Sequence, residues 1–132
     1  MVTLGEGVFK NCTSLKNITF SEKLVSIGAS CFSGCQDLEK VEIFENVYEI
    51  GASAFLNCNK LTELILGKNV SSIGDGFIKN CTALEKVEIN EENSSFVVED
   101  KIIFTSDKKK VVAAYYFTEE KEIVLPETVT AL

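Results

Sequence analysis

The sequence predicts a solenoid, in which copies of one short unit stack as successive coils around a shared core. Three observations predict it. Glycines recur every 23 residues; the same interval carries cysteines, leucines and phenylalanines; and one short apolar–polar alternation occurs in each unit. A unit this short has an apolar side that only neighbouring copies can bury, so stacking builds the core.

The repeat extends from Leu4 to Ser95, and we place its four units at 4–26, 27–49, 50–72 and 73–95. Six positions keep the 23-residue register through these units. They are Gly5, Gly28, Gly51 and Gly74; Cys12, Cys35, Cys58 and Cys81; Leu15, Leu38, Leu61 and Leu84; Ile18, Val41, Leu64 and Val87; Phe20, Ile43, Leu66 and Ile89; and Phe9, Phe32 and Phe55, with Ile78 in the fourth place.

Each unit contains one strand and one turn. In the second unit Val41 and Ile43 alternate with Lys40 and Glu42, which is the period of a strand with one buried face. Upstream, the segments GASCF and GASAF predict a short helical or 3₁₀ turn. Stacking then brings equivalent strands side by side, about 4.8 Å apart, in a parallel sheet.

The consensus I-G-x-x-A-F-x-N-C-x-x-L-x-x-V-x-I resembles the BspA-type repeat of the leucine-rich repeat superfamily. The resemblance implies a leucine-rich-repeat solenoid of the α/β type, a right-handed superhelix whose parallel strands form a concave sheet. It also implies an extracellular or cell-surface, adhesin-like protein, with a host matrix or surface protein, or a glycan, as partner. The fourth unit departs from the pattern because its aromatic residue shifts to Phe77.

After Asn90 the repeat is interrupted. Two apolar runs, Lys101–Phe104 and Val111–Tyr116, flank the polar stretch Thr105–Lys110, which predicts a β-hairpin with a longer loop. We assign 96–131 to a hairpin and strand insertion between repeats, in which EIVLPETVTAL supplies another short strand. Leu132 falls where a further, truncated repeat begins, so we expect an excerpt of a longer array whose apolar end favours end-to-end self-association.

Composition excludes several functions. The net charge of −7 repels a phosphate backbone, so we expect no nucleic-acid partner. No apolar run approaches the roughly 20 residues that cross a bilayer, which argues against membrane insertion. The chain has no histidine, the commonest general base and metal ligand. We therefore expect no enzyme, no catalytic residues and no cofactor.

The cysteines and asparagines each allow a functional and a structural interpretation. Metal sites place cysteines at short spacings such as C-x₂-C, whereas these recur once per unit, and parallel Cβ vectors suit disulfides poorly. We interpret them, with Cys31, as core residues and expect no metal. Asn11, Asn57 and Asn80 share a repeat position with Gly34, which indicates a left-handed turn residue. Glycosylation is the alternative, because Asn11, Asn17, Asn69, Asn80 and Asn93 begin N-x-S/T sequons.

The exposed side of the predicted sheet carries the candidate site. Alternation predicts three outward columns: Asn17–Lys40–Glu63–Lys86, Thr19–Glu42–Ile65–Glu88 and Ser21–Phe44–Gly67–Asn90. Two apolar side chains, Phe44 and Ile65, stand among charges of alternating sign, which suggests a contact surface; the alternative is that single exposed apolar residues are common. The predicted partner-binding residues are Lys40, Glu42, Phe44, Glu63, Ile65, Lys86 and Glu88.

Two functions remain from this pattern. The first is a non-catalytic module that binds a protein or glycan through the concave sheet. The second is a passive spacer that displays other domains, for which the number of coils matters more than the chemistry of one face.

Overall fold

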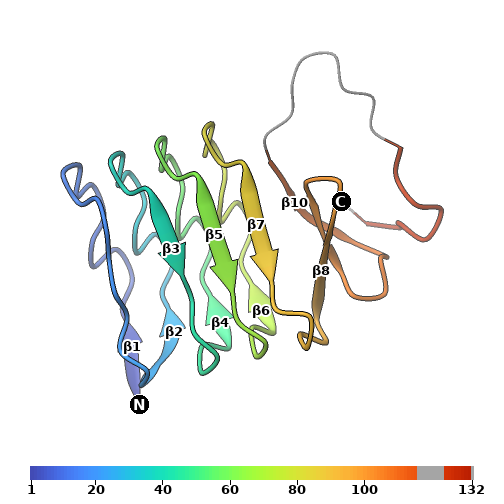
Figure 1. Cartoon of the computed structure of the whole chain (residues 1–132), viewed down its shortest axis with the longest axis horizontal. Coiled ribbons are helices and arrows are strands. Elements are labelled where there is room, and N and C mark those ends of the chain that lie inside the picture. Colours follow the sequence, from blue (N-terminus) through green and yellow to red (C-terminus); the bar gives the residue numbers. More distant parts are fainter. Residues whose placement is uncertain (116–123, 132) are drawn as a thin grey trace.

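The chain forms a stack of coils that is closed at one end by a small antiparallel sheet (Figure 1). The computed structural model describes residues 1–115 and 124–131. Leu132, the predicted start of a further repeat, lies outside the described residues, as do Tyr116 and the first two residues of the predicted strand at 122–131. In the described part of that segment, Ala131 forms an isolated bridge with Lys110, and Val124 and Leu125 are not in a strand.

Two parallel sheets run along the stack, each with one short strand from most coils. The first sheet has the order β3-β5-β7 and contains β3 (Lys40–Glu42), β5 (Glu63–Leu66) and β7 (Lys86–Ile89). The second has the order β1-β2-β4-β6 and contains β1 (Val2–Leu4), β2 (Leu24–Ile27), β4 (Glu49–Ile50) and β6 (Ser72–Ile73). The predicted parallel solenoid is therefore confirmed, with a second sheet that the sequence reasoning did not anticipate.

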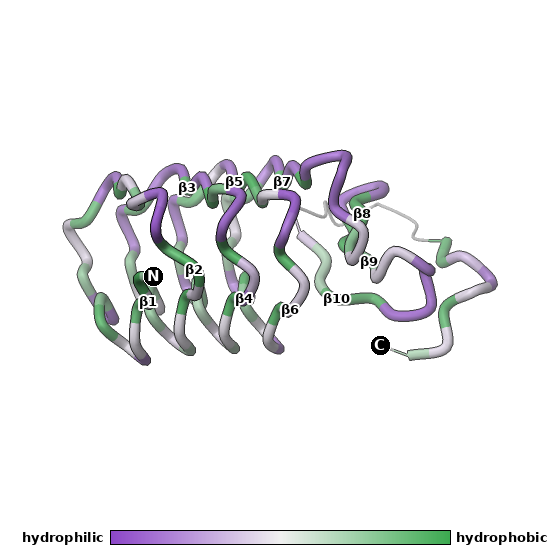
Figure 2. The backbone as a smooth tube through the Cα atoms, turned by 90° about the horizontal axis from the view of Figure 1, so that it is seen from below, coloured by the Kyte–Doolittle hydropathy of each residue, from purple (hydrophilic) through white to green (hydrophobic). Residues whose placement is uncertain are grey.

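Sequence register and strand register coincide. Val41 pairs with Leu64, and Leu64 with Val87, so that each residue meets the residue 23 positions further on. These three side chains point inward and are buried. The coils are seen from below in Figure 2, where the two parallel sheets form separate walls of the same stack.

The third wall consists of turns, and the helical or 3₁₀ turns expected there are absent from the described residues. In the third coil the N–H of Ala54 donates to the Gly51 carbonyl at 3.3 Å, and that of Cys58 to Phe55 at 3.3 Å. Each of these turns contains a residue with positive φ, Ser53 at 56° and Asn57 at 61°. A helix needs consecutive right-handed residues, so these two positions interrupt it.

The core is one continuous column inside the coils. Phe9 stacks on Phe32 with ring centroids 5.3 Å apart, and Phe32 on Phe55 at 5.4 Å. In the fourth coil Ile78 takes the phenylalanine position, and Phe77 beside it is also buried. The first coil is less enclosed, because Leu4, Phe9, Leu15 and Ile18 are only partly buried.

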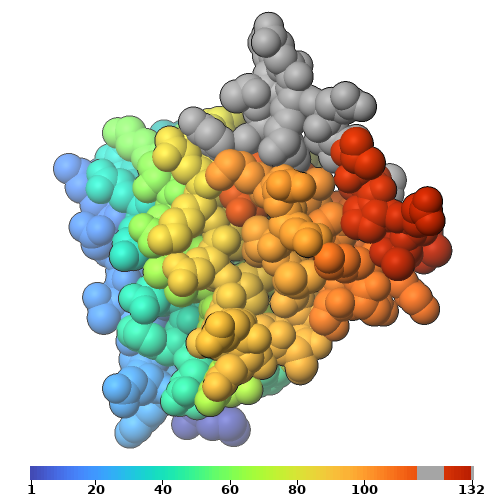
Figure 3. Space-filling model, turned by 45° about the vertical axis from the view of Figure 1, so that its right-hand side comes forward, coloured from blue at the N-terminus to red at the C-terminus, as the bar shows by residue number. Residues whose placement is uncertain are grey.

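The segment after Asn90 forms an antiparallel sheet of order β10-β9-β8, with β8 at Phe96–Glu99, β9 at Ile102–Thr105 and β10 at Val111–Ala114. The predicted hairpin is confirmed as β9 and β10, and β8 adds a third strand. Figure 3 shows this sheet packed against the last coil. Tyr115, directly after β10, is buried within the same hydrophobic core as the coils.

Candidate functional site

The outward face of the β3-β5-β7 sheet, which we call the outer face, contains the predicted partner-binding residues. Because side chains alternate along a strand, burial of Val41, Leu64 and Val87 turns their neighbours outward. The register then aligns two outward rows. Lys40 pairs with Glu63 and Glu63 with Lys86; Glu42 pairs with Ile65 and Ile65 with Glu88.

Four charged residues on the outer face, Lys40, Glu63, Lys86 and Glu88, form ion pairs with one another. Lys40 Nζ lies 3.9 Å from Glu63 Oε2, and Lys86 Nζ lies 3.6 Å from Glu63 Oε1 and 3.5 Å from Glu88 Oε2. Glu63 first, and then Glu88, raises the pKa of Lys86 above its ordinary value. Exposed pairs of this kind add little stability. Their effect here is to leave much of the face locally neutral despite the acidic chain.

Phe44 follows β3 on the same face, and 37% of its surface is exposed. The neighbouring position one coil further on is Gly67, which has no side chain to cover the ring. A Cβ at Gly67 would lie 2.8 Å from the Phe44 carbonyl oxygen, so the two backbones are too close for a larger residue. Ile65 lies two residues before Gly67 and is half-buried. Phe44 and Ile65 are thus diagonal neighbours, which in a sheet are within reach of an aromatic side chain.

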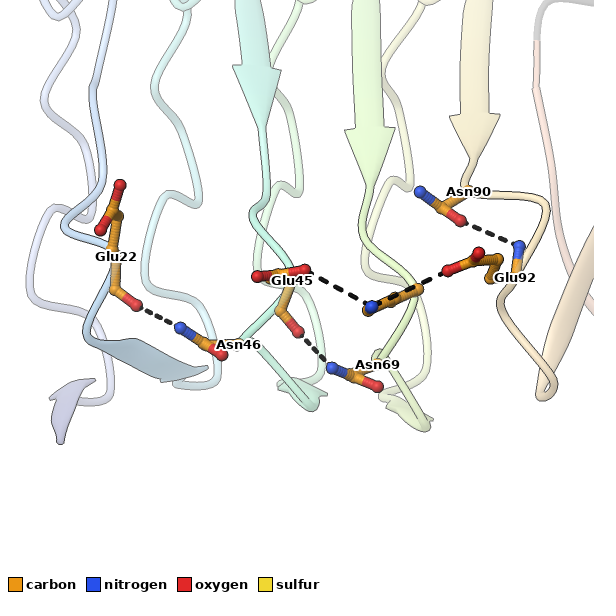
Figure 4. A network of polar contacts seen from close by, with 7 residues as sticks. Glu22, Glu45, Asn46, Asn69, Asn90 and Glu92 are labelled. Atoms are coloured by element: carbon orange, nitrogen blue, oxygen red, sulfur yellow. Dashed lines mark hydrogen bonds and ion pairs between the residues drawn. The ribbon is translucent and has the colours of Figure 1, made fainter.

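A polar network at the edge of the outer face holds the loops that carry Phe44 (Figure 4). Asn46 Nδ2 donates to the Glu22 carbonyl and Asn69 Nδ2 to the Glu45 carbonyl, both at 2.7 Å. Lys68 Nζ lies between two carboxylates, 3.6 Å from Glu45 and 3.7 Å from Glu92. Sequence reasoning missed this network, although Asn46 and Asn69 are one repeat interval apart.

Asn93 continues the network at the last coil. Its Nδ2 donates to the carbonyls of Gly67 and Val70, both at 3.0 Å, while its Oδ1 accepts from the backbone of Ser95 and Phe96. Asn69 and Asn93, both predicted as sequon asparagines, therefore use their side-chain amides in backbone contacts. These contacts give the two residues a structural role as loop anchors.

The cysteines line the interior as free thiols. Cys31, Cys35, Cys58 and Cys81 are buried and Cys12 is partly buried. The thiols of Cys35, Cys58 and Cys81 each donate to the carbonyl of the phenylalanine one coil earlier, at 3.0–3.3 Å. Burial raises the pKa of Cys31 and Cys35. The side-chain hydrogen bond with Cys81 and then burial raise the pKa of Cys58, and the same hydrogen bond lowers the pKa of Cys81. Buried, hydrogen-bonded thiols fit the predicted packing role.

Two features of the described residues concern metal binding and membrane insertion. Across residues 1–115 and 124–131, no three of the side chains of cysteine, aspartate and glutamate gather in a way that could hold a metal ion. In the same residues, no helix has the length and apolar character needed to span a bilayer.

Stacked coils with one leucine in each repeat, and with one outer-face strand in each of the second to fourth repeats, define the architecture of a leucine-rich repeat solenoid. The chain matches the family described as the BspA type leucine rich repeat region, in six copies over residues 1–110. The chain belongs to the BspA-type leucine-rich repeat family. Among curated proteins, none has a sequence that matches it.

Two solved structures are similar to the chain. One is a leucine rich cell surface protein from Faecalibacterium prausnitzii A2-165, with 34% identity and a TM-score of 0.63 over 65% of this chain and 23% of that protein. The other is the pneumococcal vaccine antigen PcpA, with 23% identity and a TM-score of 0.68 over 96% of this chain and 38% of that one. The chain thus spans 23% and 38% of the lengths of these two proteins.

Proposed function

We propose that this chain is a non-catalytic binding module of a cell-surface or secreted protein and that it binds a protein partner through the outer face. Membership of the BspA-type family supports a repeat module. The similar protein from Faecalibacterium prausnitzii is described as a cell surface protein, which supports the same location for this chain. The partner-binding residues in this proposal are those of the outer face: Lys40, Glu42, Phe44, Glu63, Ile65, Lys86 and Glu88.

One observation carries the proposal: an exposed phenyl ring next to a bare glycine, with Ile65 diagonally beside it, on a sheet where most of the charged side chains already form ion pairs. Aromatic anchors surrounded by polar residues dominate the energy of many interfaces. The sheet is held by the buried column behind it, so the face is formed before a partner arrives. A preformed face loses little conformational entropy on binding. Association is reversible and needs no chemistry.

The test compares three forms of the chain on arrays of surface proteins, matrix proteins and glycans. In the first variant Phe44→Ser removes the ring, and Ile65→Thr removes apolar surface but keeps the β-branched side chain that suits a strand. In the control, Tyr48→Ser removes another exposed aromatic residue that lies outside the outer face. Circular dichroism establishes that all three remain folded.

We expect the wild-type chain and the Tyr48→Ser control to bind the same protein, and the double variant to lose that binding. A partner that binds all three forms equally would contradict the outer-face proposal. Binding that is confined to glycans would leave the outer face as the binding surface, but the partner would then be a glycan and not a protein.

The uniform stack favours a second function, a spacer that displays other domains. The aromatic rings repeat at 5.3 and 5.4 Å, and the network of Figure 4 connects successive coils, so added coils lengthen the stack without changing its form. A spacer predicts that the wild-type chain binds nothing on the arrays and that the intact protein tolerates the double variant. Loss of function on removal of a coil, with no effect of the double variant, would favour the spacer.

A further inference from the structure

The turn wall of the solenoid is held by rows of hydrogen bonds that all run in one direction. In each of the first three coils, N–H groups at alternate turn residues donate to carbonyls of the next coil. The central row joins Phe9 to Cys31, Phe32 to Ala54 and Phe55 to Phe77, at 2.9, 2.8 and 2.7 Å. In the third coil the two flanking rows join Ser53 to Asp75 and Asn57 to Lys79, both at 3.0 Å.

The fourth coil has the same three donors, and the described residues offer them no acceptors. The residues equivalent to Ser53, Phe55 and Asn57 are Gly76, Ile78 and Asn80, and their N–H groups have no hydrogen-bond partner in the part of the chain that the structure describes. Gly76 and Asn80 keep the positive φ of the earlier donors, at 67° and 63°. Ile78 is only 5% exposed, so its free N–H is in a buried residue, where an unpaired donor is unfavourable.

These three residues line one wall of a cavity of about 350 Å³, which we call the end cavity. Val112–Ala114 of β10 and Tyr115 directly after it also line this cavity. β10 is an edge strand: it pairs with β9 on one side, and on the other the Val111 N–H donates to the Ala131 carbonyl at its first residue. The end cavity therefore lies between a row of free N–H donors and an edge strand.

We propose that the end cavity binds a peptide segment of another polypeptide, whose carbonyls at alternate residues continue the three rows. The third coil already bonds to acceptors arranged in this way, which are the carbonyls of Asp75, Phe77 and Lys79. A peptide backbone supplies several carbonyls in a row, whereas a single small anion cannot occupy three donors that are spread over alternate residues. Ile78, Val112 and Ala113 add an apolar lining for one side chain of the peptide. Binding of this kind resembles the addition of a strand to a sheet edge.

The probe is an acetylated and amidated peptide with the sequence of Ile73–Asn80, which carries the three carbonyls that accept hydrogen bonds from the N–H groups of the third coil. It is titrated into the ¹⁵N-labelled whole chain, and the amide resonances are followed by NMR. We expect saturable downfield shifts and slower hydrogen exchange at Gly76, Ile78 and Asn80. A scrambled peptide of the same composition serves as control. Absence of shifts at these amides, or shifts only at other coils, would overturn the proposal.

Inorganic phosphate is titrated in parallel. If phosphate shifts the three amides and displaces the peptide, the end cavity is an anion site and the peptide proposal is wrong. If phosphate does not shift the resonances of these amides, the proposal that they bind a row of peptide carbonyls is supported.

Two variants place a bulky side chain in the cavity. Ala113→Trp fills the cavity from the side of β10. If this variant fails to fold, Ala114→Trp takes its place, because Ala114 is exposed and a larger side chain there narrows the cavity. Ala52→Trp is the matched control, because Ala52 is an exposed turn residue of the third coil that does not line the cavity. We expect the shifts to be lost in a folded cavity variant and kept in the control. Unchanged peptide binding in a folded cavity variant would contradict the proposal.

Discussion

At the scale of single residues, the turn conformations were partly predictable. The shared position of Asn11, Gly34, Asn57 and Asn80 predicted left-handed residues, and their φ values of 61–77° confirm it. A second left-handed position, at Ser30 and Ser53, was missed because serine is not typical of that conformation. The signal was nevertheless present, since Gly7 and Gly76 occupy the same place in the first and fourth repeats.

The thiols provide the first prediction at this scale. With a bulky maleimide at neutral pH, we expect one rapid adduct on the native chain, at the partly buried Cys12, and five adducts after unfolding in urea. Burial blocks the reagent at the other four positions, and the raised pKa of Cys31, Cys35 and Cys58 keeps those three thiols protonated. Intact mass measurement and peptide mapping provide the count. Rapid native modification of Cys35 or Cys58 would contradict the interior column.

At the scale of elements, strands were more predictable than the segments between them. The alternation around Val41 is a local property of the sequence, and the 23-residue interval then determines which strands are neighbours. The second parallel sheet was missed because β4 and β6 have only two residues each, too short for a recognisable alternation. The prediction of helical turns was wrong because N–H groups of the turn wall donate instead to carbonyls of the next coil. β8 was missed because only the two flanking runs were assigned to the hairpin.

The repeat glycines provide a prediction about how elements pack. A Cβ on Gly51 would meet the backbone of the preceding coil, contacting Ala29 N and lying 2.6 Å from Gly28 C, and backbone cannot turn aside as a side chain can. We expect Gly51→Ala to lower the free energy of unfolding by at least about 2 kcal/mol, as overpacking does in dense cores. Urea denaturation followed by circular dichroism measures it.

Gly5→Ala is the matched control for that prediction. Gly5 occupies the same repeat position, but the nearest atom to its Cβ would be Val8 Cγ2 at 3.5 Å, an ordinary contact. Its φ is not positive, so alanine fits and the change in stability should stay within about 1 kcal/mol. Equal losses at Gly5 and Gly51 would show that the position needs glycine for its backbone conformation and not for coil spacing.

At the scale of the whole molecule, the candidate site was predictable as a set of columns but not as a surface. The 23-residue interval and strand alternation place Lys40, Glu63 and Lys86 in one row, as observed. Exposure of Phe44 depends on the absent side chain of Gly67 and on loop anchors such as Asn69, which are contacts between coils. The end cavity depends on how β10 meets the fourth coil, and no repeat in the sequence describes that junction.

Burial along the stack predicts that stability differs between coils. Leu61 and Leu15 hold the same repeat position, yet Leu61 is fully buried between coils and Leu15 is only partly buried in the first coil. In a solenoid each coil contacts only its neighbours, so stability is close to a sum of local terms. Leu61→Ala should therefore cost about 2–5 kcal/mol of unfolding free energy, the range for leucines enclosed in a core. Leu15→Ala should cost clearly less, because it leaves a smaller cavity.

Hydrogen exchange separates this local effect from a global one. In the wild-type chain the Phe9 N–H should exchange faster than the Phe32 N–H, although both donate to the next coil at 2.8–2.9 Å, because the first coil opens without the others. Leu15→Ala should accelerate exchange in the first coil alone, whereas Leu61→Ala should accelerate it on both sides of the third coil. If the two variants lower stability equally and accelerate exchange throughout, the stack unfolds as a single cooperative unit. Stability would then not depend on the position of a coil.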